Sequence, residues 1–237
     1  MSLLSIVLPC YEEALSLPEL YKKAIFITDN YDIEIIFLDN GSKDQSWEIM
    51  QSLKEKERIR FIKLQTNKGY GFGIKYALNF CNGKYIGWTH ADLQTDLFDV
   101  IKAFELLSQK INCKSNNIKY ALKGKRLGRK ASDMFLSTVM GFITKLIFFS
   151  NNLYEINAQP SIFDRSILNS LKKTPDDYNF DLGVFLIANS KKYTFLRLPV
   201  LFPERLYGKS HWNINLISKV KFIINTFGGL IKMRIKI

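Results

Sequence analysis

The segment 90–96 carries three side chains that suit a hard metal ion. It follows a short apolar run, and it places His90, Asp92 and Gln94 at every second position. Mg²⁺ and similar cations take oxygen ligands, commonly one or two protein carboxylates together with substrate phosphates. If the loop is extended, alternate residues lie on one side, so these three side chains can meet one ion. The alternative interpretation is an ordinary polar loop with a helix cap at residue 95 or 96.

Two other polar segments could contact a nucleotide. Asp39 follows a β-branched run and opens the turn 39–44, where a carboxylate can accept hydrogen bonds from a base N–H or from ribose hydroxyls. The alternative is a turn followed by a helix N-cap at Asp44 or Ser46. Lys68 and Gly69 begin a glycine-rich stretch beside a predicted helix N-terminus, where anions are favoured. That stretch matches neither a GxGxxG motif nor a P-loop, so by itself it is weak support for a phosphate site.

Two segments in the second half also carry chemistry. The segment 205–211 combines Arg205 with a glycine, Ser210 and His211, a composition that suits a loop closing on a diphosphate. A solvated basic loop explains it equally well. Asp181 lies inside an apolar stretch, and a buried aspartate needs a partner or a role. It is a candidate general base, metal ligand or helix cap.

Alternating apolar runs predict how these segments are positioned. The first half alternates short strands with helices, which indicates a mostly parallel sheet with crossover helices. The expected strands are 4–8, 33–38, 59–64, 85–88 and 120–122, and the expected helices are 17–28, 46–57, 71–81 and 97–108. In such sheets ligands bind beyond the carboxyl ends of the strands, and the polar segments above follow those ends. The second half is less regular, with possible strands at 157–163 and 194–200 and apolar helical patterns at 134–149 and 213–227.

Composition narrows the class of protein. The chain has 237 residues, 47% hydrophobic residues and a formal net charge of +12, which fits a globular α/β protein with an anionic partner. Its three cysteines form no CxxC pair, which favours a reducing compartment. The first residues do not form a secretory signal, and no uncharged apolar run reaches the roughly 20 residues that span a bilayer. Because no RNP-like, KH-like or zinc-finger motif occurs, we expect no nucleic-acid partner.

Four motifs in order resemble those of family 2 glycosyltransferases. Residues 5–13 (SIVLPCYEE) are similar to the family's opening strand and Pro-x-Tyr-Asn-Glu loop, and residues 39–44 (DNGSKD) to its Asp-Asp-Gly-Ser-x-Asp turn. Asn67-Lys68-Gly69 matches Asn-x-Gly, and residues 91–94 (ADLQ) resemble the end of Asp-Ala-Asp-Leu-Gln. The later segments 124–126, 157–163 and 205–210 look like the dolichol- and polyprenyl-phosphate sugar transferase branch. The sequence departs from the family pattern at Glu12, Asn40 and His90.

The resemblance implies a GT-A (Rossmann-like) fold and a site for a UDP- or GDP-sugar with Mn²⁺ or Mg²⁺. Its implied roles cover the following residues: Pro9, Tyr11, Glu13, Asp39, Lys68 and Gly69 at the nucleotide; Asp92, Gln94 and His90 at the metal; Arg126, Ser210 and His211 at the donor diphosphate or acceptor; and Asp92, Asp181 and Arg205 in catalysis. Imidazole suits Mn²⁺ better than Mg²⁺, so His90 puts the choice of metal in doubt.

The expected function is metal-dependent, inverting transfer of a sugar to a polyprenyl phosphate or lipid-linked acceptor at a membrane surface. We expect a transferase domain at 1–212, a basic amphipathic appendage at 213–237 that contacts lipid, and a cytoplasmic location at the membrane face. The alternatives are a soluble glycan or protein acceptor, or a non-catalytic nucleotide-binding member. The sequence leaves open whether the chain forms a homo-oligomer.

Overall fold

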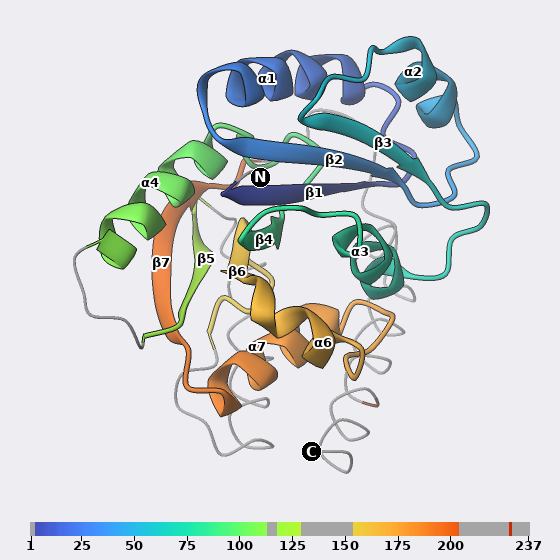
Figure 1. Ribbon diagram of the computed structural model, residues 1–237. Coiled ribbons are helices and arrows are strands. Elements are labelled where there is room, and N and C mark those ends of the chain that lie inside the picture. Colours follow the sequence, from blue (N-terminus) through green and yellow to red (C-terminus); the bar gives the residue numbers. More distant parts are fainter. Residues whose placement is uncertain (1–2, 113–117, 129–153, 204–227, 229–237) are drawn as a thin grey trace.

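One sheet runs through the part of the chain that the computed structural model describes, which is residues 3–112, 118–128, 154–203 and 228 (Figure 1). In sheet order its strands are β3 (Ile59–Lys63), β2 (Ile33–Asp39), β1 (Leu4–Cys10), β4 (Tyr85–Trp88), β6 (Ser161–Asp164), β5 (Tyr120–Leu127) and β7 (Thr194–Leu201). The predicted α/β fold with a mostly parallel sheet is confirmed. The described strands pair in parallel except for β6, which runs antiparallel to both of its neighbours.

Strand β6 joins two parallel sets of strands. On one side β1 pairs in parallel with β2 and β4, and β2 pairs in parallel with β3. On the other side β5 pairs in parallel with β7. Ser161 of β6 is in register with both Trp88 of β4 and Lys123 of β5, antiparallel to each. Because β6 is antiparallel to both β4 and β5, those two strands run in the same direction. Their carboxyl ends therefore lie at the same edge of the sheet.

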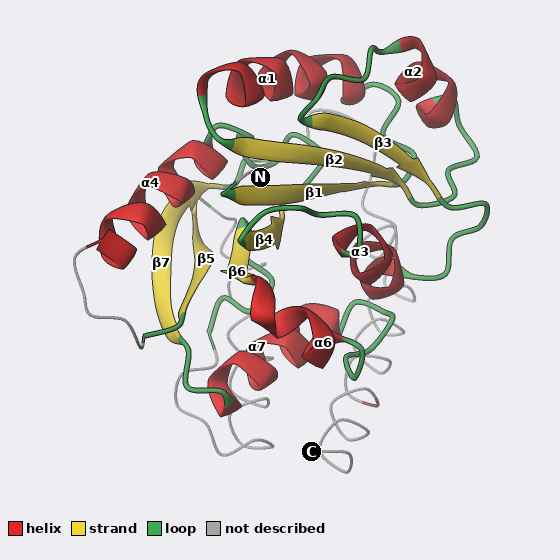
Figure 2. Cartoon of the chain, in the orientation of Figure 1, coloured by secondary structure: helices red, strands yellow, loops and turns green. Residues whose placement is uncertain are grey.

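Helices cover both faces of the sheet (Figure 2). The described helices are α1 (Leu17–Asn30), α2 (Ser46–Ser52), α3 (Tyr70–Leu78), α4 (Asp99–Asn112), the 3-10 turn η1 (Arg165–Ile167), α6 (Leu168–Leu171) and α7 (Phe180–Ser190). Helices α1 and α4 pack on one face and α3, α6 and α7 on the other. The central strands are apolar on both faces, as buried parallel strands are.

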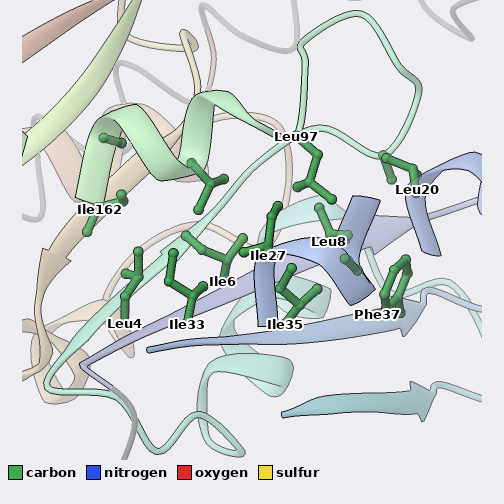
Figure 3. Packing of buried hydrophobic residues seen from close by; sticks show 14 of the residues in the cluster. Leu4, Ile6, Leu8, Leu20, Ile27, Ile33, Ile35, Phe37, Leu97 and Ile162 are labelled. Carbon is green, nitrogen blue, oxygen red and sulfur yellow. The ribbon is translucent and has the colours of Figure 1, made fainter. Parts of the chain in front are cut away.

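Two apolar layers result from this arrangement. In the first, Ile6 of β1 and Ile35 of β2 meet Leu20 and Ile27 of α1 (Figure 3). In the second, the aromatic side chain of Trp88 packs with residues of α3 and α7 on the opposite face. Burial of these side chains stabilises each layer by roughly 25 cal/mol per Å² of apolar surface removed from water.

Some element boundaries differ from the prediction. The helix predicted at 46–57 ends at Ser52, because Leu53 is extended and residues 56–59 form a tight bridge that leads into β3. The strand predicted at 157–163 begins only at Ser161, after a turn closed by the Ala158 N–H to the Glu155 carbonyl oxygen. The helical patterns at 134–149 and 213–227, and with them the boundary predicted after residue 212, lie outside the described residues. Among the described residues, no helix has the length and apolar character needed to cross a bilayer.

Both described cysteines, Cys10 and Cys81, are free and buried in the two apolar layers. Burial, with a smaller contribution from nearby carboxylates, raises the pKa of Cys10 well above its usual value. Burial also raises the pKa of Cys81 to about 12.

We therefore expect both thiols to resist iodoacetamide in the native protein at about pH 8, since the thiolate is the reactive form. Peptide mapping by mass spectrometry, before and after denaturation in guanidinium, measures this. Alkylation of either residue at the same rate in native and denatured protein would contradict the burial described above.

Candidate active site

The loop after β1 is held by side chains of the loop after β2. Three consecutive backbone N–H groups donate to these side chains: Glu12 to Ser42 Oγ at 3.0 Å, Glu13 to Ser46 Oγ at 3.0 Å, and Ala14 to Asp44 Oδ2 at 3.2 Å. Asp44 Oδ1 also accepts from the Ser46 N–H at 3.0 Å. The N-cap residue of α2 is Gln45, so the N-cap predicted at Asp44 or Ser46 is wrong by one position. The Ser and Asp of the turn motif therefore fix the shape of the neighbouring loop, a role that their spacing alone did not reveal.

Asp39 stands at the end of β2 with one carboxylate oxygen available to a ligand. Its side chain is buried, and Oδ1 accepts from the Ser42 N–H at 3.0 Å. Within the described part of the chain, Oδ2 has no hydrogen-bond partner. An unsatisfied buried carboxylate oxygen is costly, so a donor from a bound molecule would relieve it. This geometry suits the predicted contact of Asp39 with a base N–H or a ribose hydroxyl.

Two glycines, one in the turn after β2 and one in the loop before α3, lie very close to the backbone of other segments. Gly41 has φ +74°, and a Cβ there would lie 2.5 Å from the backbone nitrogen of Asn67. Gly69 has φ +110°, and a Cβ there would clash with the carbonyl oxygen of Asp176. Both positions therefore require glycine. Asn40 adds a bond from its Nδ2 to the Gly69 carbonyl oxygen at 3.3 Å, so the turn after β2 and the loop before α3 form one unit.

The other residues predicted at the nucleotide lie along the same edge. Pro9 lies near the end of β1, and its partner on β2 is Leu38, the residue before Asp39. Tyr11 hydrogen-bonds to Asn67, and its pKa is raised by partial burial and by the negative charge of Glu12. In the same loop, Glu13 Oε2 accepts from Ser16 Oγ at 3.1 Å. The Lys68 ammonium group lies 5.2 Å from the centre of the Phe72 ring, a cation–π contact.

The loop predicted to hold a metal is bent. Leu93 has φ +59°, and Asp92 Oδ1 accepts from the Gln94 N–H at 3.1 Å. The alternation expected for an extended loop therefore does not apply. The Gln94 side-chain Nε2 donates to the Pro203 carbonyl oxygen at 3.1 Å, which ties the loop to the segment after β7. Asp96 Oδ1 accepts from the Phe98 N–H at 3.1 Å, within the turn that precedes α4 at Asp99.

One aromatic ring connects the metal loop with the predicted diphosphate residue. The ring centres of His90 and Phe202 are 5.6 Å apart, and the Arg126 guanidinium lies 5.5 Å from the same Phe202 ring. Arg126 Nε donates to Glu155 Oε2 at 2.7 Å, so a carboxylate holds the guanidinium in place. Arg126 and His90 are thereby brought to one corner of the sheet edge. Arg205, Ser210 and His211 lie outside the described residues.

The donor set in this loop fits a cation that is shared with a substrate. Among the described residues, no group of three or more His, Cys, Asp or Glu side chains could enclose a metal. Mg²⁺ and Mn²⁺ sites of phosphate-transferring proteins use one or two carboxylates and take the remaining ligands from the substrate. Asp92, nearly fully buried beside His90, supplies such a carboxylate. The imidazole of His90 would favour Mn²⁺ over Mg²⁺.

Asp181 is surrounded by hydrogen-bond donors beneath this edge. Its Oδ1 accepts from Trp88 Nε1 at 3.2 Å and from Lys123 Nζ at 3.2 Å, and its Oδ2 accepts from Tyr70 OH at 3.0 Å. Asp181 is not the cap of α7, whose N-cap residue is Asn179. The prediction that Asp181 acts as a base stays a prediction. Sequence reasoning missed Lys123 because it was read as part of a basic run, although alternation in a strand places it on the same face as buried Ala121.

The sheet order and the helices on both faces define a mixed α/β protein with the GT-A arrangement. The family model described as "Glycosyl transferase family 2" matches residues 5–171. That stretch is well over half of the chain, so the chain belongs to glycosyl transferase family 2.

Two curated relatives act on lipid phosphates according to their names. A dolichyl-phosphate beta-glucosyltransferase from Dictyostelium discoideum is 32% identical over 114 residues, which are 44% of this chain and 35% of the relative. An undecaprenyl-phosphate 4-deoxy-4-formamido-L-arabinose transferase from Edwardsiella ictaluri is 23% identical over 226 residues, which are 94% of this chain and 66% of the relative. The chain thus spans about one third to two thirds of the length of these relatives.

Two solved structures share the fold. Glucosyl-3-phosphoglycerate synthase from Mycobacterium tuberculosis, in complex with Mn²⁺, UDP and phosphoglyceric acid, superposes with a TM-score of 0.67 at 13% identity, covering 95% of this chain and 78% of that one. A mannosyltransferase from Pyrobaculum calidifontis, in complex with GDP-Man and Mn²⁺, superposes with a TM-score of 0.65 at 15% identity, covering 97% of this chain and 64% of that one. These similarities confirm the GT-A fold that the sequence motifs implied.

The interlocked loops predict the effect of one substitution. Ser46→Ala removes the acceptor of the Glu13 N–H, and Ser46 is fully buried. We expect the free energy of unfolding to fall by about 1–3 kcal/mol, because an unsatisfied amide is left behind. Urea unfolding followed by circular dichroism measures it. Ser52→Ala is the matched control, because its exposed hydroxyl at the end of the same helix donates only to the Ile49 carbonyl oxygen. We expect a change within about 0.5 kcal/mol there, and equal effects would contradict the bracing role.

Proposed function

We propose that the chain transfers a sugar from a nucleotide-sugar donor to a polyprenyl phosphate or another lipid-linked acceptor, with inversion at the anomeric carbon. The observation that carries this proposal is the convergence of three family motifs at one sheet edge: the turn at Asp39, the loop 67–69 and the loop at Asp92. The names of the two curated relatives support a lipid-phosphate acceptor. The complexes of the two structural relatives support a UDP- or GDP-sugar donor.

The nucleotide would bind across the ends of β1 and β2. Asp39 Oδ2 would accept a hydrogen bond from a ribose hydroxyl or a base N–H, which satisfies a buried oxygen. Pro9, Tyr11 and Glu13 would form one wall, and Lys68 and Gly69 the other. Because the side chains of Ser42 and Asp44 already fix the first wall, little ordering would be needed when the nucleotide binds.

The metal and the cations would act on the donor diphosphate. Asp92, Gln94 and His90 would hold Mn²⁺ or Mg²⁺, which when bound supplies positive charge against the leaving nucleoside diphosphate. Arg126, held by Glu155, would add a fixed guanidinium at the same corner. Arg205, Ser210 and His211 are proposed to complete the phosphate-binding loop. The formal net charge of +12 agrees with a protein that handles two phosphorylated substrates.

The acceptor reduces the demand for a base. A polyprenyl phosphate is already an anion, so its oxygen can attack the sugar without losing a proton to a side chain. Asp181 would be needed as a base only for a hydroxyl acceptor on a soluble glycan or protein. The contacts of Asp181 with Lys123 and Tyr70 favour the phosphate acceptor, because they occupy both of its oxygens.

Substitution of Asp92 tests the metal assignment. Asp92→Asn keeps an oxygen that can accept from the Gln94 N–H but removes the charge. We expect it to reduce Mn²⁺-dependent turnover and nucleotide binding by roughly 100-fold, the size that losing even a partner of a metal ligand can produce. Asp92→Ala is expected to be at least as severe.

Thermal shift with UDP, GDP and their sugars, in Mn²⁺ or Mg²⁺, measures binding, since a ligand of the folded state raises its melting temperature. Asp96→Asn is the control, because its carboxylate is half exposed and pairs with Lys23. Unchanged turnover in Asp92→Ala would refute the metal assignment. A wild-type protein that binds nucleotide but turns over no nucleotide sugar would be a non-catalytic member of the family.

The proposed location is a membrane surface on the cytoplasmic side, with residues 213–237 as the lipid-binding appendage. The tail alternates Lys232, Arg234 and Lys236 with apolar residues, which suits an anionic interface. We expect vesicles that contain anionic lipid to bind the full chain more strongly than a chain truncated after Trp212, and to lose that difference at high salt. Co-sedimentation measures both, and equal binding of the two chains would remove the tail from the proposal.

A further inference from the structure

A lysine and an aspartate form an ion pair in the interior of the protein. Lys123 Nζ lies 3.2 Å from Asp181 Oδ1, and their side chains are 1% and 3% exposed. Lys123 Nζ also donates to Ser161 Oγ at 2.8 Å, across the β5–β6 pairing. Lysine is among the residues least often fully buried, so this pair needs an explanation beyond packing.

Each hydrogen bond around the pair has a fixed direction. The Gln159 amide Nε2 donates to Tyr70 OH at 2.7 Å, and Tyr70 OH in turn donates to Asp181 Oδ2 at 3.0 Å. Trp88 Nε1 can only donate, and its partner is Asp181 Oδ1 at 3.2 Å. Three donors therefore converge on the two oxygens of Asp181, and one of them, Lys123, carries the opposite charge.

Burying such an ion pair is unfavourable compared with filling the same space with apolar side chains. Removing two charges from water is costly, and a protein with apolar residues of similar volume in their place is often as stable or more so. Burial lowers the pKa of Lys123, and the negative charge of Asp181 opposes that shift. Burial together with Asp181 raises the pKa of Tyr70 well above its ordinary value, so its proton stays in place as a donor.

The pair joins the elements that carry the proposed donor site. Trp88 ends β4, directly before the loop of Asp92. Lys123 lies three residues before Arg126 on β5, and Tyr70 is the first residue of α3 after Gly69. The Asp181 carboxylate therefore contacts three segments: the end of β4 before the metal loop, strand β5 that carries Arg126, and the start of α3 after the glycine-rich loop. A displacement of about 1 Å at such positions can cost 100-fold in rate.

We propose that Lys123 and Asp181 are a positioning pair that sets the spacing between these three segments, and that Asp181 is not the general base. The proposal rests on the proposed function for its effect on sugar transfer. Its effect on nucleotide binding can be measured without any acceptor, which keeps the two proposals separable.

The test compares single and double substitutions. Lys123→Met and Asp181→Leu each leave one charge buried without its partner, and we expect each to lower the melting temperature by about 10 °C. The double variant Lys123→Met/Asp181→Leu leaves no buried charge, although Trp88 Nε1 loses its acceptor. We therefore expect it to melt several degrees above either single variant, though below wild type. Its affinity for UDP or GDP with Mn²⁺ should nevertheless fall about tenfold, and kcat/KM for sugar transfer about 100-fold.

Two further variants keep the test decisive if the double variant folds poorly. Tyr70→Phe removes one hydroxyl and leaves the ion pair, and we expect nucleotide affinity to fall about tenfold, as for a lost bond to a charged group. Lys56→Met/Asp29→Leu removes an exposed pair, with side chains 38% and 54% exposed, and should change neither stability nor affinity appreciably.

Several outcomes would overturn the proposal. A stable double variant with wild-type nucleotide affinity and turnover would make the pair purely structural. An Asp181→Asn protein that binds UDP or GDP normally but has lost turnover, beside an active Lys123→Met protein, would make Asp181 the base. If wild type binds nucleotide with Mn²⁺ but transfers no sugar to undecaprenyl phosphate, the proposed acceptor fails, and the affinities of the variants still decide the role of the pair.

Discussion

The parallel pairing of β1 with β2 and β4 is the constraint on which the site depends. Its register sets Cys10 beside Asp39 and Val7 beside Trp88, so the chain leaves these strands at one edge. Burial of the side chains on both faces fixes such a register to the residue, since a slip by one would turn every side chain to the opposite face. Polar residues that are 50 or more positions apart in the chain are thereby brought to the same rim.

Beyond the strand ends, hydrogen bonds from backbone N–H groups to side chains replace the backbone hydrogen bonds of the sheet. The hydroxyls of Ser42 and Ser46 and the carboxylate of Asp44 accept from backbone N–H groups of the neighbouring loop. Short polar side chains compete well for backbone groups where regular structure stops. In this chain they hold an irregular segment in one shape, with Asp39 Oδ2 left over for a ligand.

Sequence reasoning identified the elements of the first half and the loops between them. It succeeded because apolar runs and turn residues are local signals, as at residues 33–44. It could not find the direction of β6, since the sequence of a four-residue strand does not indicate which strands it pairs with. Nor could it find the bend at Leu93 or the partners of Asp181. Those contacts join residues up to 111 positions apart, and each depends on the sheet already being formed.

The placement of β6 also has a consequence for assembly. Strands β1 to β4 are consecutive in the chain and pair among themselves, but within the described ranges the outer edge of β4 pairs only with residues 161–164. During synthesis that edge stays unpaired while some 70 further residues are made, and an open edge can pair with the wrong strand. Non-local pairings of this kind slow folding, because a long loop must close first. The proposed donor site is therefore completed only after β4 has been made: its metal loop leaves β4, but β5 and α7, which fix it, follow later in the chain.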